Sequence, residues 1–188
     1  MTLVLTQHDP LSTLPRFVQS DVFEIVPCDL EAKFNLRIRE TEVDQAAEAL
    51  RLALPRRMGE LASAGACSAI CVGPDEWLLS VPLEDAGAVR AAFANLAQKT
   101  PLSLVETTDR DCSLRVAGPK AAYALKAVCP HDVEAMSVGT ATRTLFDHAD
   151  LLVVRETATS FRLQVLRSWT PHVTSLLSKI GREVATGL

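Results

Sequence analysis

The stretch Val72-Gly73-Pro74-Asp75-Glu76-Trp77-Leu78-Leu79 predicts a tight turn between two strands. Gly73-Pro74 interrupts the apolar run of residues 66–72, because glycine and proline break regular structure. After the turn, Trp77, Leu79 and Val81 alternate with other residues and therefore share one face of a second strand. The hairpin places one of only two tryptophans just after its turn, which predicts a core or an interface at this point.

The composition around this hairpin is that of an ordinary globular chain. The sequence has 188 residues, of which 48% are apolar and 22% charged. A chain of this size buries enough surface to fold without disulfides or metals. Its net charge of −4 and its scattered basic residues argue against a nucleic-acid partner. Five irregularly spaced cysteines, no leader peptide and no apolar run of about 20 residues predict a cytoplasmic protein with free thiols and no membrane span.

The first half of the chain predicts alternating strands and helices on the basis of its apolar periods. Thr41 is expected to cap the first helix, and Pro55 is expected to end it. In order, we expect an arm at 1–20, an edge strand at 22–26, a strand at 33–39, a helix at 41–54, a loop at 56–65, the hairpin, a helix at 84–98 and a strand from 102.

The second half predicts the same kinds of element in a similar order. Gly118-Pro119 is expected to lead into a helix with proline near its first position, and Pro130 is expected to end that helix. In the last strand, Arg162 and Gln164 are expected to point outward, away from the apolar face. In order, we expect a strand at 112–116, a helix at 119–128, strands at 141–146, 151–155 and 161–166, and a final helix around 173–184.

Short sequence matches suggest that the two halves are repeats. Leu36-Arg37-Ile38 is matched by Leu114-Arg115-Val116, and Trp77 and Leu79 are matched by Phe161 and Leu163. Chance similarity stays open as the alternative. The predicted fold class is α+β, with two repeated β-α-β-β-α-type halves whose antiparallel sheets carry helices on one face. The predicted organisation is an arm at 1–20 and one domain at 21–188, with pseudo-repeats at about 30–107 and 108–188.

Motifs for nucleotide binding and for catalysis are missing from the sequence. No G-x-G-x-x-G, P-loop or G-x-S-x-G pattern occurs. Gly118-Pro119-Lys120 suggests a phosphate site at a helix N-terminus, but a proline in the first turn with an exposed lysine explains it better. Asp109 and Asp111 flank Arg110, which favours a solvated or locally paired loop over an acid–base couple.

The cysteines and histidines do not form a recognisable metal or nucleophile site. Cys67 and Cys71 share a strand face but lack two further zinc ligands, so burial as small apolar side chains is favoured. The segments Cys129-Pro130-His131-Asp132 and Asp147-His148-Ala149-Asp150 are typical of turns. His8 and His172 are isolated in the sequence. We therefore predict no catalytic, cofactor-binding or metal-binding residue, and both Trp77 and Trp169 stay open as core or interface residues.

Several motifs follow one another along most of residues 65–180. They are the stretch at 72–79, Thr108-Asp109-Arg110, Leu114-Arg115-Val116-Ala117-Gly118-Pro119, Leu125, Cys129-Pro130-His131-Asp132-Val133, Gly139-Thr140, Arg143-Thr144 and Arg167-Ser168-Trp169. In their order and similar spacing, these motifs resemble the gamma-subunit family of heterotetrameric sarcosine oxidase. In this sequence His131 replaces a usually apolar residue of that family, and Lys120 replaces a common arginine.

The resemblance implies an accessory chain of a larger enzyme, related in fold to the folate-binding aminomethyltransferases. That enzyme oxidises sarcosine with oxygen to glycine and hydrogen peroxide, and passes the one-carbon unit to tetrahydrofolate as 5,10-methylenetetrahydrofolate. The implied partners are the alpha, beta and delta subunits. FAD, FMN, NAD and tetrahydrofolate are implied to bind other subunits, with none on this chain.

Three functional hypotheses therefore remain at the level of the sequence. The first is a non-catalytic structural subunit of the flavoenzyme. The second is a stand-alone folate-binding or one-carbon-transfer protein of the aminomethyltransferase type, although no position matches an acidic residue that would hold a pterin. The third is an unrelated interaction protein.

Overall fold

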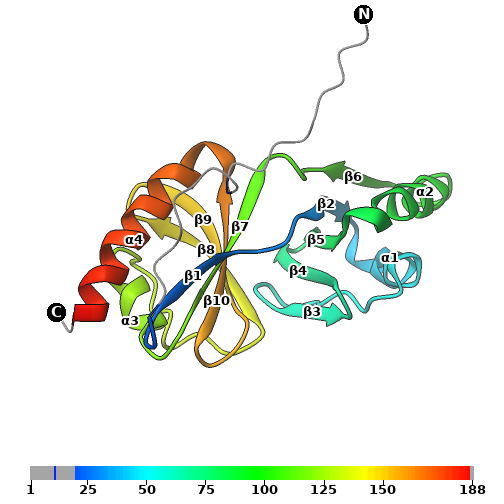
Figure 1. The fold of residues 1–188 in the computed structure, drawn as a ribbon. Coiled ribbons are helices and arrows are strands. Elements are labelled where there is room, and N and C mark those ends of the chain that lie inside the picture. The colour runs from blue at the N-terminus through cyan, green and yellow to red at the C-terminus, as the bar shows by residue number, and fades with distance from the viewer. Residues whose placement is uncertain (1–10, 12–19, 187–188) are drawn as a thin grey trace, which may run out of the picture.

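The chain folds into four layers, with two antiparallel sheets in the middle and helices on the outer side of each sheet (Figure 1). The computed structural model describes residue 11 and residues 20–186. Sheet A contains, in spatial order, β1 (Glu24–Pro27), β7 (Asp111–Ala117), β10 (Ser160–Leu166), β9 (Ala149–Arg155) and β8 (Thr140–Phe146). Sheet B contains, in spatial order, β3 (Leu61–Ala64), β4 (Cys67–Gly73), β5 (Glu76–Pro82), β2 (Glu31–Ile38) and β6 (Leu102–Glu106).

Two helices cover each sheet, and short 3₁₀ turns lead into three of them. The helices α3 (Ala121–Lys126) and α4 (Thr170–Thr186) lie on sheet A, and α1 (Val43–Leu50) and α2 (Ala86–Leu96) lie beside sheet B (Figure 1). The 3₁₀ turns are η1 (Glu40–Glu42) before α1, η2 (Leu83–Asp85) before α2 and η3 (Arg167–Trp169) before α4.

Three apolar clusters hold these layers together. The largest joins sheet A to α3 and α4 and includes Leu114 and Phe161. A second joins sheet B to its helices and includes Phe34 and Trp77. The third lies between the two sheets, and its buried members are Ile70, Ala141, Leu152 and Val154. The inner faces of the two sheets therefore pack against each other, but the apolar cluster between them is much smaller than the cluster that joins each sheet to its helices.

The hairpin predicted around Trp77 is confirmed. It is formed by β4 and β5, which pair antiparallel with an irregularity between Cys71 and Gly73. Trp77, Leu79 and Val81 are all buried in the helix-facing core. The Trp77 Nε1–H donates to the carbonyl oxygen of Pro55 at 2.7 Å, so the indole belongs to the core of sheet B.

The two sheets have the same strand order when read from β3 and from β8. The order β3-β4-β5-β2-β6 in sheet B corresponds to β8-β9-β10-β7-β1 in sheet A. The edge strands at the far end differ in origin. β6 comes from the same part of the chain as the rest of sheet B and pairs with β2, whereas β1 precedes β2 in sequence but pairs with β7 of sheet A. At the opposite end, a β-bridge between Glu60 and Thr140 joins the two sheets.

Several predicted element boundaries are wrong. Glu42, within a 3₁₀ turn, is the N-cap of α1 in place of Thr41, and it makes no side-chain cap. The same helix ends at Leu50, because Arg51 adopts a left-handed conformation with φ of 56°, well before Pro55. The segment expected to be a loop at 56–65 contains β3, which pairs with β4.

The predicted helix at 119–128 is also shorter than expected. It spans Ala121–Lys126, so Pro119 lies before its N-cap Lys120 and Pro130 lies beyond its end. Proline disfavours helical geometry at the residue before it, which here is Cys129. The edge strand at 22–26 is confirmed as β1, and the terminal helix as α4.

Arg162 and Gln164 point away from the apolar face of β10, as predicted. This outer face is not exposed, however: both side chains are more than nine-tenths buried, because that face of sheet A is covered by sheet B. Lys33 on β2 is buried for the same reason. Residues 1–10 and 12–19 of the predicted arm lie outside the described residues. Within the described part of the chain, no helix is long and apolar enough to cross a membrane.

Candidate functional site

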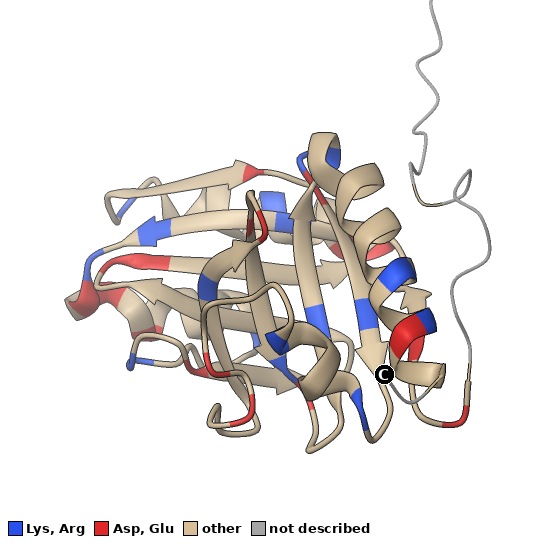
Figure 2. Ribbon diagram, turned by 90° about the vertical axis from the view of Figure 1, so that its left-hand side faces the viewer, with Lys and Arg blue, Asp and Glu red and all other residues tan. Residues whose placement is uncertain are grey.

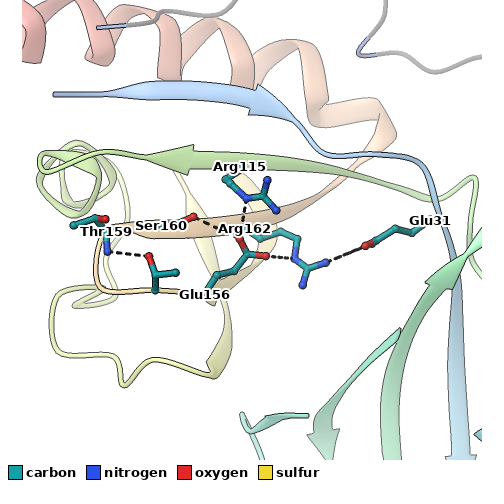
Figure 3. A network of polar contacts seen from close by, with 7 residues as sticks. Glu31, Arg115, Glu156, Thr159, Ser160 and Arg162 are labelled. Atoms are coloured by element: carbon teal, nitrogen blue, oxygen red, sulfur yellow. Dashed lines mark hydrogen bonds and ion pairs between the residues drawn. The ribbon is translucent and has the colours of Figure 1, made fainter. Parts of the chain in front are cut away.

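A cluster of four charged side chains lies between the sheets (Figure 3). The Arg162 Nε lies 2.9 Å from Glu156 Oε1, and its Nη1 donates to both carboxylate oxygens of Glu31 at 3.3 and 3.4 Å. Arg115 Nε donates to the other Glu156 oxygen at 2.9 Å. Since Glu31 belongs to β2 and Arg162 to β10, this cluster ties sheet B to sheet A.

This cluster pairs two positive with two negative charges. Only about a tenth of the Arg162 side chain is exposed, and a charge buried to that extent is tolerated only when it is paired. Both of its partner carboxylates, Glu31 and Glu156, are also mostly buried. With both guanidiniums engaged by carboxylates, the arrangement is suited to holding two sheets together and leaves no free base.

Cys28, in the connection between β1 and β2, lies close to this charged cluster. Burial raises the pKa of the Cys28 thiol to about 11, although the positive charges of Arg115 and Arg162 oppose the shift. A thiol with this pKa is almost fully protonated at neutral pH, and the protonated form is a poor nucleophile. Cys28 therefore lacks the activation that a catalytic cysteine needs.

Lys33 and Asp111 form a second inter-sheet contact. The Lys33 Nζ donates to the backbone carbonyl oxygen of Asp111 at 2.9 Å. Burial lowers the pKa of Lys33, while the carboxylates of Asp111 and Glu31 oppose that change. Burial likewise raises the pKa of Asp111. The two shifts have one cause, which is the removal of both charges from water between the sheets.

A cavity of about 340 Å³ opens between the same two faces. Gln164 on β10 is opposite Leu152 on β9, and Leu152 is opposite Arg143 on β8, so these side chains form one row across sheet A. Asn35 and Leu78 are a cross-strand pair of sheet B that lines the facing wall. The polar lining also includes Arg110, Asp111 and Asp150.

The structure accounts for the cysteine motifs considered in the sequence. Cys67 and Cys71 both contribute to the core of sheet B, as the apolar interpretation predicted. The Cys129 thiol is buried 3.7 Å from the Thr144 hydroxyl, whereas His131 is exposed. The Asp132 carboxylate accepts hydrogen bonds from two backbone N–H groups within its own turn. These neighbours in sequence do not assemble a nucleophile–base pair.

Two other candidates have partners that the sequence did not reveal. The turn predicted at 147–150 is confirmed between β8 and β9 but is shorter, because Ala149 and Asp150 already belong to β9. His172, predicted to be isolated, is not: its Nε2 hydrogen-bonds with Asp147 Oδ2 at 2.9 Å, and its ring packs edge-on against Trp169. His8 lies outside the described residues. Among the described residues, no group of three His, Cys, Asp or Glu side chains could hold a metal ion.

The loop around Arg110 is locally paired only in part. Arg110 Nε lies 3.7 Å from Asp111 Oδ1, and Asp109 Oδ1 lies 4.0 Å from Arg167 Nη2. Asp111 itself is the first residue of β7 and faces the cavity. The cavity could not be predicted from the sequence. Alternation of apolar and polar residues along a strand does not distinguish a face turned to water from a face turned to a second sheet.

Comparison with known proteins identifies the family. The model of the "Sarcosine oxidase, gamma subunit family" matches residues 39–181. The chain belongs to this family. A search of the curated proteins finds no match for this member of the gamma-subunit family.

Solved structures show the same fold. A chain of the heterotetrameric sarcosine oxidase from Corynebacterium sp. U-96, solved with pyrrole 2-carboxylate, is similar with a TM-score of 0.79 and 24% identity, over 90% of this chain and 89% of that one. The glycine cleavage system aminomethyltransferase T from Bartonella henselae is similar with a TM-score of 0.62 and 12% identity. That match covers 81% of this gamma-subunit family member and 44% of the aminomethyltransferase chain.

Proposed function

We propose that this chain is the gamma subunit of a heterotetrameric sarcosine oxidase and that its role is structural, in assembly with alpha, beta and delta subunits. The match of the gamma-subunit family model over residues 39–181 carries the proposal. The similarity to a chain of the heterotetrameric enzyme from Corynebacterium over 90% of this sequence supports it.

The reaction would belong to the complete complex. It oxidises sarcosine with oxygen to glycine and hydrogen peroxide, and transfers the one-carbon unit to tetrahydrofolate to give 5,10-methylenetetrahydrofolate. FAD, FMN, NAD and tetrahydrofolate would bind the other subunits. The state of the inter-sheet charges supports this division, because Arg115 and Arg162 are paired with carboxylates and Cys28 stays protonated.

Exposed apolar side chains support a role in assembly. Met58 and Val138 are more than half exposed, and both lie within two residues of the Glu60–Thr140 bridge that joins the sheets. Trp169 is partly exposed beside His172. Large apolar side chains at the surface are typical of protein interfaces when they gather in one region.

Two further parts of this proposal are that the fold consists of two repeated halves and that the protein is cytoplasmic. The shared strand order of the two sheets supports an origin in two β-α-β-β-α halves, at about 30–107 and 108–188. In sheet B Leu36 is opposite Trp77, whereas in sheet A Leu114 is opposite Leu163. Because Trp77 is matched to Phe161 in the sequence, the strand pairing in sheet A is shifted by two residues from the one that the sequence matches imply. All five cysteines are free thiols, which supports a reducing cytoplasm.

A stand-alone folate-binding or one-carbon-transfer protein is the second candidate. The similarity to the aminomethyltransferase fold and the partly buried carboxyl of Asp111 at the cavity favour it. Titration of the purified chain with a reduced folate tests it. Binding at millimolar ligand supports this candidate, and no binding removes it.

Oxygen consumption with sarcosine tests the main proposal. The purified chain alone should consume no oxygen, while the complex co-expressed with its partner subunits should turn over sarcosine. A complex expressed without this chain should be less stable and less active. Turnover by the chain alone, or a fully active and stable complex without it, would contradict the proposal.

A further inference from the structure

Within the part of the chain that the structure describes, five polar side chains line the inter-sheet cavity without a side-chain hydrogen bond, although three of them take part in longer ion pairs. None of them donates or accepts a side-chain hydrogen bond with another described residue, although each faces the same cavity. They are Arg110, Asp111, Arg143, Asp150 and Gln164. Several converging polar groups in one pocket, with an apolar wall, are the usual form of a small-molecule site.

Gln164 is the most telling of the five. It is 8% exposed and lines the cavity, so the accessible part of its amide faces the cavity. The neighbouring side chains in its row are Ser113 on β7 and Leu152 on β9, and neither hydrogen-bonds to it. A polar molecule in the cavity would therefore contact this amide.

The two arginines at the cavity remain open to an anion. Arg143 Nη2 lies 3.6 Å from Glu76 Oε1, and that oxygen already accepts a hydrogen bond from Asn35 Nδ2 at 2.7 Å. Arg110 lies 3.7 Å from its neighbour Asp111. Both separations exceed hydrogen-bond length, so each guanidinium keeps the paired N–H donors that bind a carboxylate.

Of the two aspartates at the cavity, Asp150 is the more open to a cation. Asp150, which lines the cavity from the start of β9, is exposed and forms no ion pair with another described residue. Asp111 is partly buried, and burial raises its pKa although the positive charges of Arg110, Lys33 and Arg143 oppose the shift. The formal charges of the lining sum to zero, with a positive and a negative pair.

We propose that this cavity binds a small zwitterion of the α-amino acid class, which carries one carboxylate and one ammonium group. The carboxylate contacts the guanidinium of Arg143 or Arg110, and the ammonium group contacts Asp150 or Asp111. The side chain of the ligand lies against the apolar wall that includes Leu78 and Leu152. A simple anion would satisfy only the arginines, and a simple amine only the aspartates.

Isothermal titration of the purified full chain with a panel of standard L-amino acids tests the proposal. Each amino acid is compared with the amine that lacks its carboxylate and the acid that lacks its amino group. We expect at least one amino acid to bind, and both singly charged analogues to bind about tenfold more weakly or worse, equivalent to about 1.4 kcal/mol. No binding by any amino acid, or equal binding by an analogue, would overturn the proposal.

Variants at exposed positions locate the site. Arg143→Gln and Asp150→Asn should each weaken binding about tenfold, since each removes one charge partner. Arg182→Gln on α4, exposed on the far side of sheet A, is the matched control and should bind as the native chain does. Unchanged affinity in both cavity variants, with native melting curves, would contradict the assignment. The readout is binding to this chain and does not depend on the proposed sarcosine oxidase role.

Discussion

Trp77 anchors the core of sheet B through one buried ring and one hydrogen bond. Its side chain is 1% exposed, and its Nε1–H donates to Pro55 O. Trp77→Phe removes that donor and part of the buried ring, so we expect a loss of about 2 kcal/mol in the free energy of unfolding. Urea unfolding followed by circular dichroism measures it.

Trp169→Phe is the matched control for this prediction. Trp169 is 37% exposed, and its known contact is an edge-on packing against His172. Substitutions at such partly exposed positions usually change stability by about 0.5 kcal/mol or less. Equal losses in the two variants would show that Trp77 is not a core anchor.

Cys28 gives a prediction about pH. Because burial raises its pKa to about 11, the reactive thiolate is scarce at neutral pH and increases only as the pH approaches that value. Alkylation of Cys28 by iodoacetamide, followed by mass spectrometry, should therefore be slow at pH 7 and accelerate up to about pH 11. A rate that reaches its plateau near pH 8 or 9 would contradict the buried environment.

At the level of elements, the turn between β7 and α3 depends on Gly118. Its φ is +118°, and a Cβ there would lie 2.5 Å from the carbonyl oxygen of Val22. The same carbonyl accepts a hydrogen bond from Lys120 N–H at 3.0 Å, so the backbone has little room to shift. Gly118→Ala should lower the free energy of unfolding by about 3 kcal/mol, from strain and displacement of β1.

Gly87→Ala is the control for the glycine prediction. Gly87 is in the first turn of α2, and nothing lies within 4 Å of a Cβ built there. Alanine in a helix is favoured by about 0.5–1 kcal/mol over glycine, so this variant should be slightly more stable. Thermal unfolding of Gly118→Ala and Gly87→Ala measures both effects. Similar melting temperatures for the two variants would contradict the strain expected at Gly118.

The sequence predicts most strands and helices, and the exceptions have physical causes. β3 was missed because Leu61-Ala62-Ser63-Ala64 is short and rich in small residues, and its pairing with β4 stabilises it. The helix predicted at 41–54 is longer than α1, because apolar residues continue beyond the end of α1 at Leu50. The left-handed geometry of Arg51 ends the helix, and Leu54 packs in the core as an irregular segment.

The inter-sheet site was not predictable from sequence patterns. Lys33, Arg162 and Gln164 occupy polar positions in strands with one apolar face, which is the pattern of a face turned to water. Only the stacking of the two sheets shows that these residues are buried. Charged residues as a whole are spread over many elements (Figure 2), so charge patterning did not mark the cavity either.

For the whole molecule, the crossing of β1 from the start of the chain into sheet A predicts that both sheets unfold together. Phe23, directly before β1, and Ile25 on β1 pack in the core of sheet A, but β1 is followed directly by β2 of sheet B. Phe23→Ala should lower stability by about 3–5 kcal/mol. In a Trp169→Phe background, where Trp77 alone reports on sheet B, the urea midpoint of Trp77 fluorescence should fall together with that of circular dichroism.

Val26→Ala is the control for this coupling. Val26 is on β1, three residues after Phe23, but is 36% exposed, so its truncation should shift the midpoint little. If Phe23→Ala left the Trp77 midpoint unchanged while circular dichroism showed an earlier, separate transition, the two sheets would be independent units.

The central claim is that this chain is built to assemble with other subunits. Native mass spectrometry of the tagged chain, purified after co-expression with candidate alpha, beta and delta subunits, tests it most directly. We predict a single species whose mass is the sum of four different subunits and which loses this chain only under dissociating conditions. A tagged chain that appears only as a free species, with the other subunits assembled without it, would contradict the account.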